Sequence, residues 1–289
     1  MQMESKRKKQ SQLREVWRRL KKDKTAMVGL FIIIVFALAV IFAEQISPFH
    51  NAIRQSGEHR LQPPSADFIF GTDAFGRDIF TRVLHGGRIS LSIGFVTASA
   101  SLLIGGLLGA MAGFYGGWGD EVIMRIMDTL MSIPSILLSL AIVAALGANM
   151  TNLLIAITVA SIPAFTRLVR ASVLTVVEQD FIEAARACGT SDFRIICKHI
   201  LPNAIGPIIV QTTASVSGMI LAAAALSFIG MGVQPPQPEW GAMLSEAREF
   251  IRTAPHMLVF PGFAIILSAL SFNLIGDGLR DALDPRLKD

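Results

Sequence analysis

Apolar residues come in long unbroken blocks along this 289-residue chain, and this feature constrains its fold more than any other. A helix needs roughly 20 mostly apolar residues to cross about 30 Å of hydrocarbon, because each residue advances about 1.5 Å. Backbone polar groups inside the bilayer must also find hydrogen-bond partners within the protein, which favours helices. The chain is 52% hydrophobic and 17% charged. The sequence therefore predicts an all-α membrane protein.

We interpret six such blocks as transmembrane helices. They lie near residues 25–46, 89–114, 133–146, 153–169, 205–231 and 258–275. The segment from Gly147 to Met150, between the third and fourth blocks, suits a tight turn between antiparallel helices. A cleavable signal peptide is the alternative for the first block. However, the apolar core of this block is too long and no small-residue cleavage site follows it.

Lys and Arg set the expected orientation, because they are retained on the cytoplasmic side during insertion. Many of them precede Thr25, including the run Lys6 to Lys9. We therefore expect six transmembrane helices with both termini cytoplasmic. The same basic run could bind nucleic acid, but directly before a span it more often contacts anionic lipid. Membrane lipid is thus an expected partner, and nucleic acid is not.

This topology divides the chain into five regions. They are a basic cytoplasmic tail (1–24), the first transmembrane helix (25–46), an extracytoplasmic loop (47–88), a five-helix core (89–276) and a second cytoplasmic tail (277–289). The first loop is expected to hold a short amphipathic helix from Arg77 to Gly86, which Asp73 could cap. The core contains a cytoplasmic loop (178–203) and an extracytoplasmic loop (232–256).

The cytoplasmic loop predicts two helices joined by a glycine bend. Gly189 suits the left-handed position that ends the first helix, and Ser191 suits the N-cap of the second. Pro202 is expected to close the second helix. An apolar stripe on the first helix is formed by Phe181, Ala184, Ala185 and Cys188. The loop should therefore form a compact knob beneath the spans.

Six residues of this loop reproduce a motif of ABC importer permeases, E-A-A-x-x-x-G-x(n)-L-P. They are Glu183, Ala184, Ala185, Gly189, Leu201 and Pro202. The resemblance implies a type I ABC importer (MetI-like) permease fold in the bacterial cytoplasmic (inner) membrane. It also implies that these residues form a coupling helix, which sits in a groove of an ATPase subunit and transmits its closure to the spans. A purely structural helix bend is the alternative.

Three further segments are similar to one branch of that family, the dipeptide, oligopeptide and nickel permeases, and specifically to their C-type subunit. They are H-I-L-P-N from His199, GTDAFGRD from Gly71 and QPPQPEWGAML from Gln234. The resemblance implies transport of di- or oligopeptides, with nickel, glutathione or another small solute as the alternative. It also implies a heterodimer with a second homologous permease, two ABC ATPase subunits that bind ATP and Mg, and an extracytoplasmic substrate-binding protein.

Small and polar residues mark candidate sites on two spans and one loop. Ser101 and the glycines of the second span recur every four residues, which predicts a packing seam with another helix of this chain or with the partner permease. The seam consists of Gly105, Gly109 and Gly113, followed by Gly117. Candidates for lining the translocation path are Gln211, Ser215 and Gly218, with hydrogen bonding between helices as an equal alternative. Candidates for contact with the binding protein are Glu239, Trp240 and Glu246.

Several functions are disfavoured by what the sequence lacks. No Gly-Lys pair occurs, so a P-loop is absent, and no H-E-x-x-H or G-x-S-x-G pattern suggests an enzyme. The cores of the spans lack Asp and Glu, which argues against a secondary transporter, the alternative of another class. Cys188 and Cys197 fall in a reducing compartment, so we expect no disulfide. The histidines lack metal-ligand spacing, and neither a metal nor a cofactor is expected in this chain.

Overall fold

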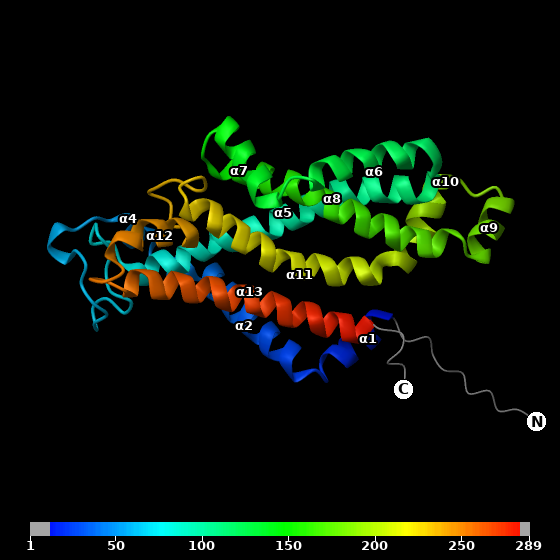
Figure 1. Cartoon of the computed structure of the whole chain (residues 1–289). Helices are drawn as coiled ribbons and strands as arrows, with labels where there is room; N and C mark the ends of the chain where they lie inside the picture. Colours follow the sequence, from blue (N-terminus) through cyan, green and yellow to red (C-terminus); the bar gives the residue numbers. More distant parts are fainter. Residues whose placement is uncertain (1–11, 284–289) are drawn as a thin grey trace, which may run out of the picture.

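A computed structural model describes residues 12–283, and the architecture it shows is a bundle of long helices (Figure 1). Within this range five helices are long and apolar enough to cross a membrane, or six if the bent pair α6 and α7 counts as one span. The prediction of an all-α membrane protein is confirmed. The helices are α1 (Gln12–Leu20), α2 (Lys24–Ile41), α3 (Ala43–Ile46), α4 (Phe49–Ile53), α5 (Ile79–Tyr115), α6 (Gly117–Met131), α7 (Ser135–Leu146), α8 (Met150–Val177), α9 (Asp180–Ala187), α10 (Asp192–Ile195), α11 (Leu201–Phe228), α12 (Trp240–Ala247) and α13 (His256–Leu283).

The two ends of the bundle differ in what they carry. The end of α13 and the helix α1 lie at the same end as α9, whereas α4 and α12 lie at the opposite end (Figure 1). This arrangement agrees with the expected placement of both tails and the loop around α9 on the cytoplasmic side. We call the two ends cytoplasmic and extracytoplasmic accordingly.

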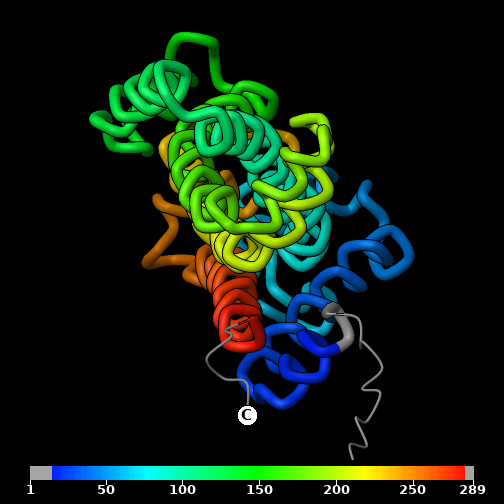
Figure 2. The backbone as a smooth tube through the Cα atoms, turned by 90° about the vertical axis from the view of Figure 1, so that its right-hand side faces the viewer, coloured from blue at the N-terminus to red at the C-terminus, as the bar shows by residue number. Residues whose placement is uncertain are grey.

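The first span, α2, lies at the edge of the bundle beside α13 (Figure 2). Asp23 caps it, because its carboxylate accepts the N–H groups of Thr25 at 2.9 Å and Ala26 at 3.3 Å. Only 11% of the apolar window of α2 is buried within the chain. Most of this helix therefore faces lipid or a partner.

The second span is longer than its sequence suggests, because α5 runs without a break from Ile79 to Tyr115. The prediction of a separate amphipathic helix over residues 77–86 is wrong, since residues 79–86 form the first turns of α5. Gly86 and Gly87 lie within this helix, and their lack of side chains lets the Trp240 ring pack against both. The cap is Asp78, which accepts the N–H of Thr81 at 3.1 Å, and not Asp73.

The third span is bent. Helices α6 and α7 meet at an angle of 85°, and Pro134 stands at the start of α7. The predicted turn between the third and fourth spans is confirmed, with Gly147 at a φ of +94°. Asn149 then caps α8 by accepting the N–H of Asn152 at 2.9 Å.

The main core lies where α5, α8, α11 and α13 pack together. Its most buried residues include Ile93, Leu153, Ile220 and Leu226. A second core cluster lies at the cytoplasmic end and joins α8 to the segment from α9 to α11. This second cluster positions the loop that carries the permease motif.

Candidate functional site

The cytoplasmic knob, residues 180–200, is closed by a Schellman motif at the end of α9. The N–H of Gly189 bonds to the carbonyl of Arg186 at 2.9 Å, and the N–H of Thr190 bonds to that of Ala185 at 3.1 Å. Gly189 has a φ of +71°, a conformation that side chains other than glycine adopt at a cost. The bend between α9 and α10 is thus fixed by backbone geometry at one glycine.

Three isoleucines attach the knob to the membrane helices. Ile182, Ile195 and Ile200 are all 0% exposed and belong to a cluster that includes Val173 and Val176 of α8. The predicted apolar stripe does not make this attachment. Ile182 faces inward, while Phe181, Ala184 and Cys188 of the stripe are exposed. Tertiary packing, and not the pattern of α9 alone, sets the rotation of this short helix.

The knob projects from the bundle (Figure 1), and it exposes two aromatic side chains among charged ones. Phe193 is 78% exposed and Phe181 is 40% exposed. Glu183 and Ala184 of the E-A-A motif are also exposed, and Ala185 is partly buried. Exposed aromatic side chains on a rigid projection are typical of a protein contact surface.

The knob continues directly into the fifth span, so the prediction that Pro202 closes a helix is wrong. Helix α10, a π-helical turn (Ile196–Ile200) and α11 form one continuous helical segment. Proline lacks an N–H and crowds the preceding turn, and the wider π turn just before it accommodates both defects. Leu201 and Pro202 therefore lie in the first turn of α11. A displacement of the knob would be passed to α11 without an intervening loop.

Polar residues of α11 fall on two different faces. Ser217 is buried and donates its hydroxyl to Oδ1 of Asn273 on α13 at 2.7 Å. Gln211 and Gly218 are exposed and Ser215 is partly exposed, and a Cβ at Gly218 would meet no atom within 4 Å. The chain itself leaves this face of α11 uncovered.

The glycine seam of α5 packs against α8 of the same chain. A Cβ at Gly105 would lie 2.8 Å from the carbonyl oxygen of Ile162, and one at Gly109 would lie 2.4 Å from that of Thr166. A Cβ at Gly113 would lie 3.0 Å from the carbonyl oxygen of Arg170. Gly117 is not part of the seam, because it has a φ of +58° and opens α6. The sequence left open whether the seam contacts another helix of this chain or the partner permease. In the structure it contacts a helix of this chain, α8.

The prediction that Glu239 and Trp240 are surface contacts is wrong, since their exposures are 1% and 0%. The Glu239 carboxylate caps α12 by accepting the N–H groups of Gly241 at 2.9 Å and Ala242 at 2.8 Å. It also accepts the Ser90 hydroxyl at 3.1 Å, and Nε1 of Trp240 donates to the Val83 carbonyl at 2.9 Å. Both side chains therefore join α12 to α5.

The third candidate, Glu246, belongs to a buried cluster of four charged residues. Its carboxylate lies 2.5 Å from Arg77 and 3.0 Å from Arg82. Asp73 pairs with Arg77 at 2.6 Å, and the side chains of Asp73, Arg77 and Arg82 are at most 5% exposed. The cluster joins the segments that begin at Gly71 and Gln234, and it is not visible from either segment alone.

Replacing Glu239 with alanine should destabilise the extracytoplasmic end of the fold. Two buried N–H groups and the Ser90 hydroxyl would lose their acceptor, which costs about 1–3 kcal/mol. We expect a lower unfolding temperature of the purified protein by scanning fluorimetry. Glu249→Ala, on an exposed residue of the same loop, is the control and should leave that temperature unchanged. Equal unfolding temperatures for both variants would contradict this role of Glu239.

The arrangement of the spans matches a transporter of known structure. The inward-facing MetNI methionine ABC transporter gives a TM-score of 0.58 at 20% identity, over 71% of this chain and 98% of that chain. This likeness shows that the two chains share a fold.

Sequence comparison then establishes the family. Residues 105–289 match the family described as "Binding-protein-dependent transport system inner membrane component", and residues 11–64 match "N-terminal TM domain of oligopeptide transport permease C". The chain belongs to this family of binding-protein-dependent inner-membrane transport components. It is therefore a multi-pass protein of the inner membrane.

Several relatives align over almost the whole chain. The dipeptide transport system permease protein DppC of Alkalihalophilus pseudofirmus is 52% identical over 95% of this chain and 90% of its own length. The glutathione transport system permease protein GsiD is 48% identical in Escherichia coli O157:H7, with the same coverage. The protein of that name from Pectobacterium atrosepticum is 45% identical over 95% of this chain and 91% of its own.

The described residues contain no group of three or more His, Cys, Asp or Glu side chains that could hold a metal ion. Two histidines instead make structural hydrogen bonds. Nε2 of His85 lies 2.8 Å from the Ser47 carbonyl, and Nε2 of His256 lies 3.2 Å from that of Thr72. Both contacts join the extracytoplasmic loops to neighbouring helices.

Proposed function

We propose that this chain forms part of the path for di- or oligopeptides delivered by an external binding protein, beside a second homologous permease. The supporting observation is the 52% identity to a dipeptide permease over 95% of the chain. Glutathione is the second candidate substrate, because relatives named for its transport are 45% and 48% identical. Two ABC ATPase subunits that bind ATP and Mg would supply the energy, since this chain has no P-loop.

Coupling to the ATPase subunits is assigned to the knob. Support comes from its exposed face around Phe181 and Phe193, its rigid bend at Gly189 and its direct continuation into α11. ATP binding would draw the ATPase subunits together, carry the knob with them and tilt the spans toward the outward-open state. The residues that would couple the ATPase subunits to the spans are Glu183, Ala184, Ala185, Gly189, Leu201 and Pro202.

The path is assigned to the open face of α11 that carries Gln211, Ser215 and Gly218. Polar side chains in a span are costly against lipid, so they are expected to face an aqueous cavity or another subunit. The opposite side of the same helix packs on α13 through Ser217 and Asn273. The face around Ser215 is therefore expected to line the interior of the permease pair.

Reconstituted transport tests the substrate and the energy source together. The chain, its partner permease, the two ATPase subunits and the binding protein would be placed in proteoliposomes supplied with ATP. We expect uptake of a radiolabelled dipeptide, with loss of uptake when this chain or ATP is omitted. Uptake of glutathione but not of dipeptides would identify glutathione as the substrate. Uptake driven by an ion gradient without the ATPase subunits would contradict the proposal.

Gly218→Leu should reduce peptide uptake roughly tenfold or more, because a bulky side chain would enter the proposed path. Folding should be preserved, since a Cβ there meets no atom and leucine favours a helix over glycine. Gly206→Leu is the matched control, because Gly206 also lies on α11 with no atom within 4 Å of a Cβ. Initial uptake rates in proteoliposomes measure the effect. Normal uptake by Gly218→Leu would remove this face from the path.

A further inference from the structure

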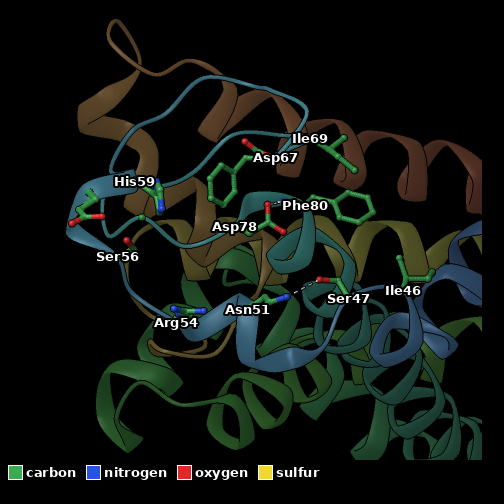
Figure 3. Close-up of a pocket in the computed structure, with 13 residues that line it drawn as sticks. Ile46, Ser47, Asn51, Arg54, Ser56, His59, Asp67, Ile69, Asp78 and Phe80 are labelled. Carbon is green, nitrogen blue, oxygen red and sulfur yellow. Dashed lines mark hydrogen bonds between the residues drawn. The ribbon is translucent and has the colours of Figure 1, made fainter.

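A pocket of about 550 Å³ lies at the extracytoplasmic end, between α4 and the loop that precedes α5 (Figure 3). Its volume falls within the range of about 300–1,000 Å³ that is usual for small-molecule sites. The lining changes in character along the pocket. Ser56 and His59 lie at its outer end, whereas Ile46, Ile69 and Phe80 lie at the end toward the first membrane helix (Figure 3). The pocket is thus polar outside and apolar toward the bilayer.

A second, apolar groove of about 200 Å³ lies next to the pocket, on the side toward the membrane helices. Phe80 lines both spaces. The groove runs between α2, α5 and α13, and its walls include Phe36, Phe70, Val83, Phe260 and Phe263. Phe263 is 57% exposed and Val259, on the same helix, is 58% exposed. This side of the groove therefore opens to the hydrocarbon of the outer half of the bilayer.

The charges in the pocket are of both signs but unequal in number. The lining contains one cationic side chain, Arg54, and three carboxylates, those of Glu58, Asp67 and Asp78. Asp78 is already used, because it accepts N–H groups of the first turn of α5. Arg54, Glu58 and Asp67 are exposed and form no ion pair with another side chain in residues 12–283. The pocket thus offers one free cation and two free carboxylates.

We propose that the pocket and groove together bind one phospholipid of the outer leaflet with a zwitterionic, ammonium-bearing headgroup. Arg54 would bind the phosphate, Asp67 and Glu58 would bind the ammonium group, and one acyl chain would pass Phe80 into the groove. An anionic headgroup such as phosphatidylglycerol fits less well, because the carboxylates would repel it. None of the lining residues comes from α11, so the site is separate from the proposed path.

Helix α2 forms one wall of the groove, and residues of α5 contact the end of this helix. Arg88 donates to the carbonyls of Val40 at 2.9 Å and Ile41 at 3.2 Å, which satisfies the open end of α2. Val40 also packs on Gly87, where a Cβ would lie 2.6 Å from it. A lipid in the groove would add contacts between α2 and the core, to which α2 is otherwise lightly packed.

Native mass spectrometry of the purified permease pair tests this site with two lipids, phosphatidylethanolamine and phosphatidylglycerol, titrated separately. We expect one phosphatidylethanolamine per copy of this chain to survive delipidation, with binding roughly tenfold tighter than that of phosphatidylglycerol. Equal binding of the two lipids would show a nonspecific lipid annulus and overturn the proposal. Displacement of the retained lipid by a dipeptide would also overturn it.

Two variants assign the lipid to this location. Glu58→Lys with Asp67→Lys, at exposed positions whose side chains form no ion pair within residues 12–283, should reverse the preference toward phosphatidylglycerol. Ala39→Phe should fill the groove and lower phosphatidylethanolamine retention roughly tenfold, because Ala39 lines it. Leu38→Phe is the matched control, since Leu38 is 49% exposed and lies outside the groove, and it should retain the lipid. Full retention in Ala39→Phe would contradict the proposed site.

Discussion

Gly109→Leu is expected to prevent the close packing of α5 on α8 and to lower the yield of folded protein in the membrane roughly tenfold. A Cβ at this position would lie 2.4 Å from the carbonyl oxygen of Thr166 and 2.9 Å from the backbone nitrogen of Arg170. Both atoms belong to the backbone of α8, so relief requires the helices to separate. Loss of close backbone contact across the seam should cost about 3 kcal/mol or more.

The neighbouring glycine provides the control for this effect. At Gly106 the nearest atoms to a Cβ are side-chain carbons at 3.8 and 3.9 Å, which is ordinary contact. Gly106→Ala should therefore leave folding intact or stabilise α5 slightly, whereas Gly109→Ala should destabilise the protein. The amount of monodisperse protein after detergent extraction and its unfolding temperature measure both variants. Equal values for the two alanine variants would contradict close packing at Gly109.

Gly189→Pro is expected to abolish ATP-driven peptide uptake while the protein still inserts into the membrane. Proline fixes φ near about −65°, so it cannot adopt the +71° observed, and it removes the N–H that bonds to Arg186. The Schellman motif would be lost and the knob would no longer hold its shape against the ATPase. A Cβ at Gly189 would meet no atom within 4 Å, so a side chain there does not clash with the membrane helices.

Substrate-stimulated ATP hydrolysis and peptide uptake in proteoliposomes measure this loss of coupling. Gly189→Asn is the control, because asparagine tolerates the left-handed conformation and should keep most of the activity. Glu183→Arg should also impair stimulated transport, since it reverses an exposed charge on the proposed ATPase contact without disturbing a buried group. Normal coupled uptake in both Gly189→Pro and Glu183→Arg would contradict the assignment of the knob.

The sequence predicts best where a property depends on neighbouring residues. Block length and composition place the membrane helices, because a span must be long and apolar whatever it packs against. Gly189 is predictable for a similar reason, since the left-handed end of α9 strongly favours glycine. The E-A-A motif beside it indicated the family that the comparisons establish.

Where the sequence fails, a distant contact decides the outcome. Gly86 and Gly87 resemble a break before the second span, yet Trp240 packs on them and α5 continues. Pro202 resembles a helix end, yet the π turn before it lets the helix run on. Glu239 and Trp240 resemble surface residues of a polar loop, yet α5 buries both of them.

The sequence alone therefore determined the class of the chain, the approximate positions of its spans and the bend of the knob. The tertiary structure decided which face of each helix is covered, as in the inward turn of Ile182 and the packing of the glycine seam on α8. It also decided that Arg77 and Glu246, far apart in the chain, share one buried cluster. The physical reason is that helix formation follows local spacing, whereas the rotation and partners of a helix depend on side chains distant in sequence.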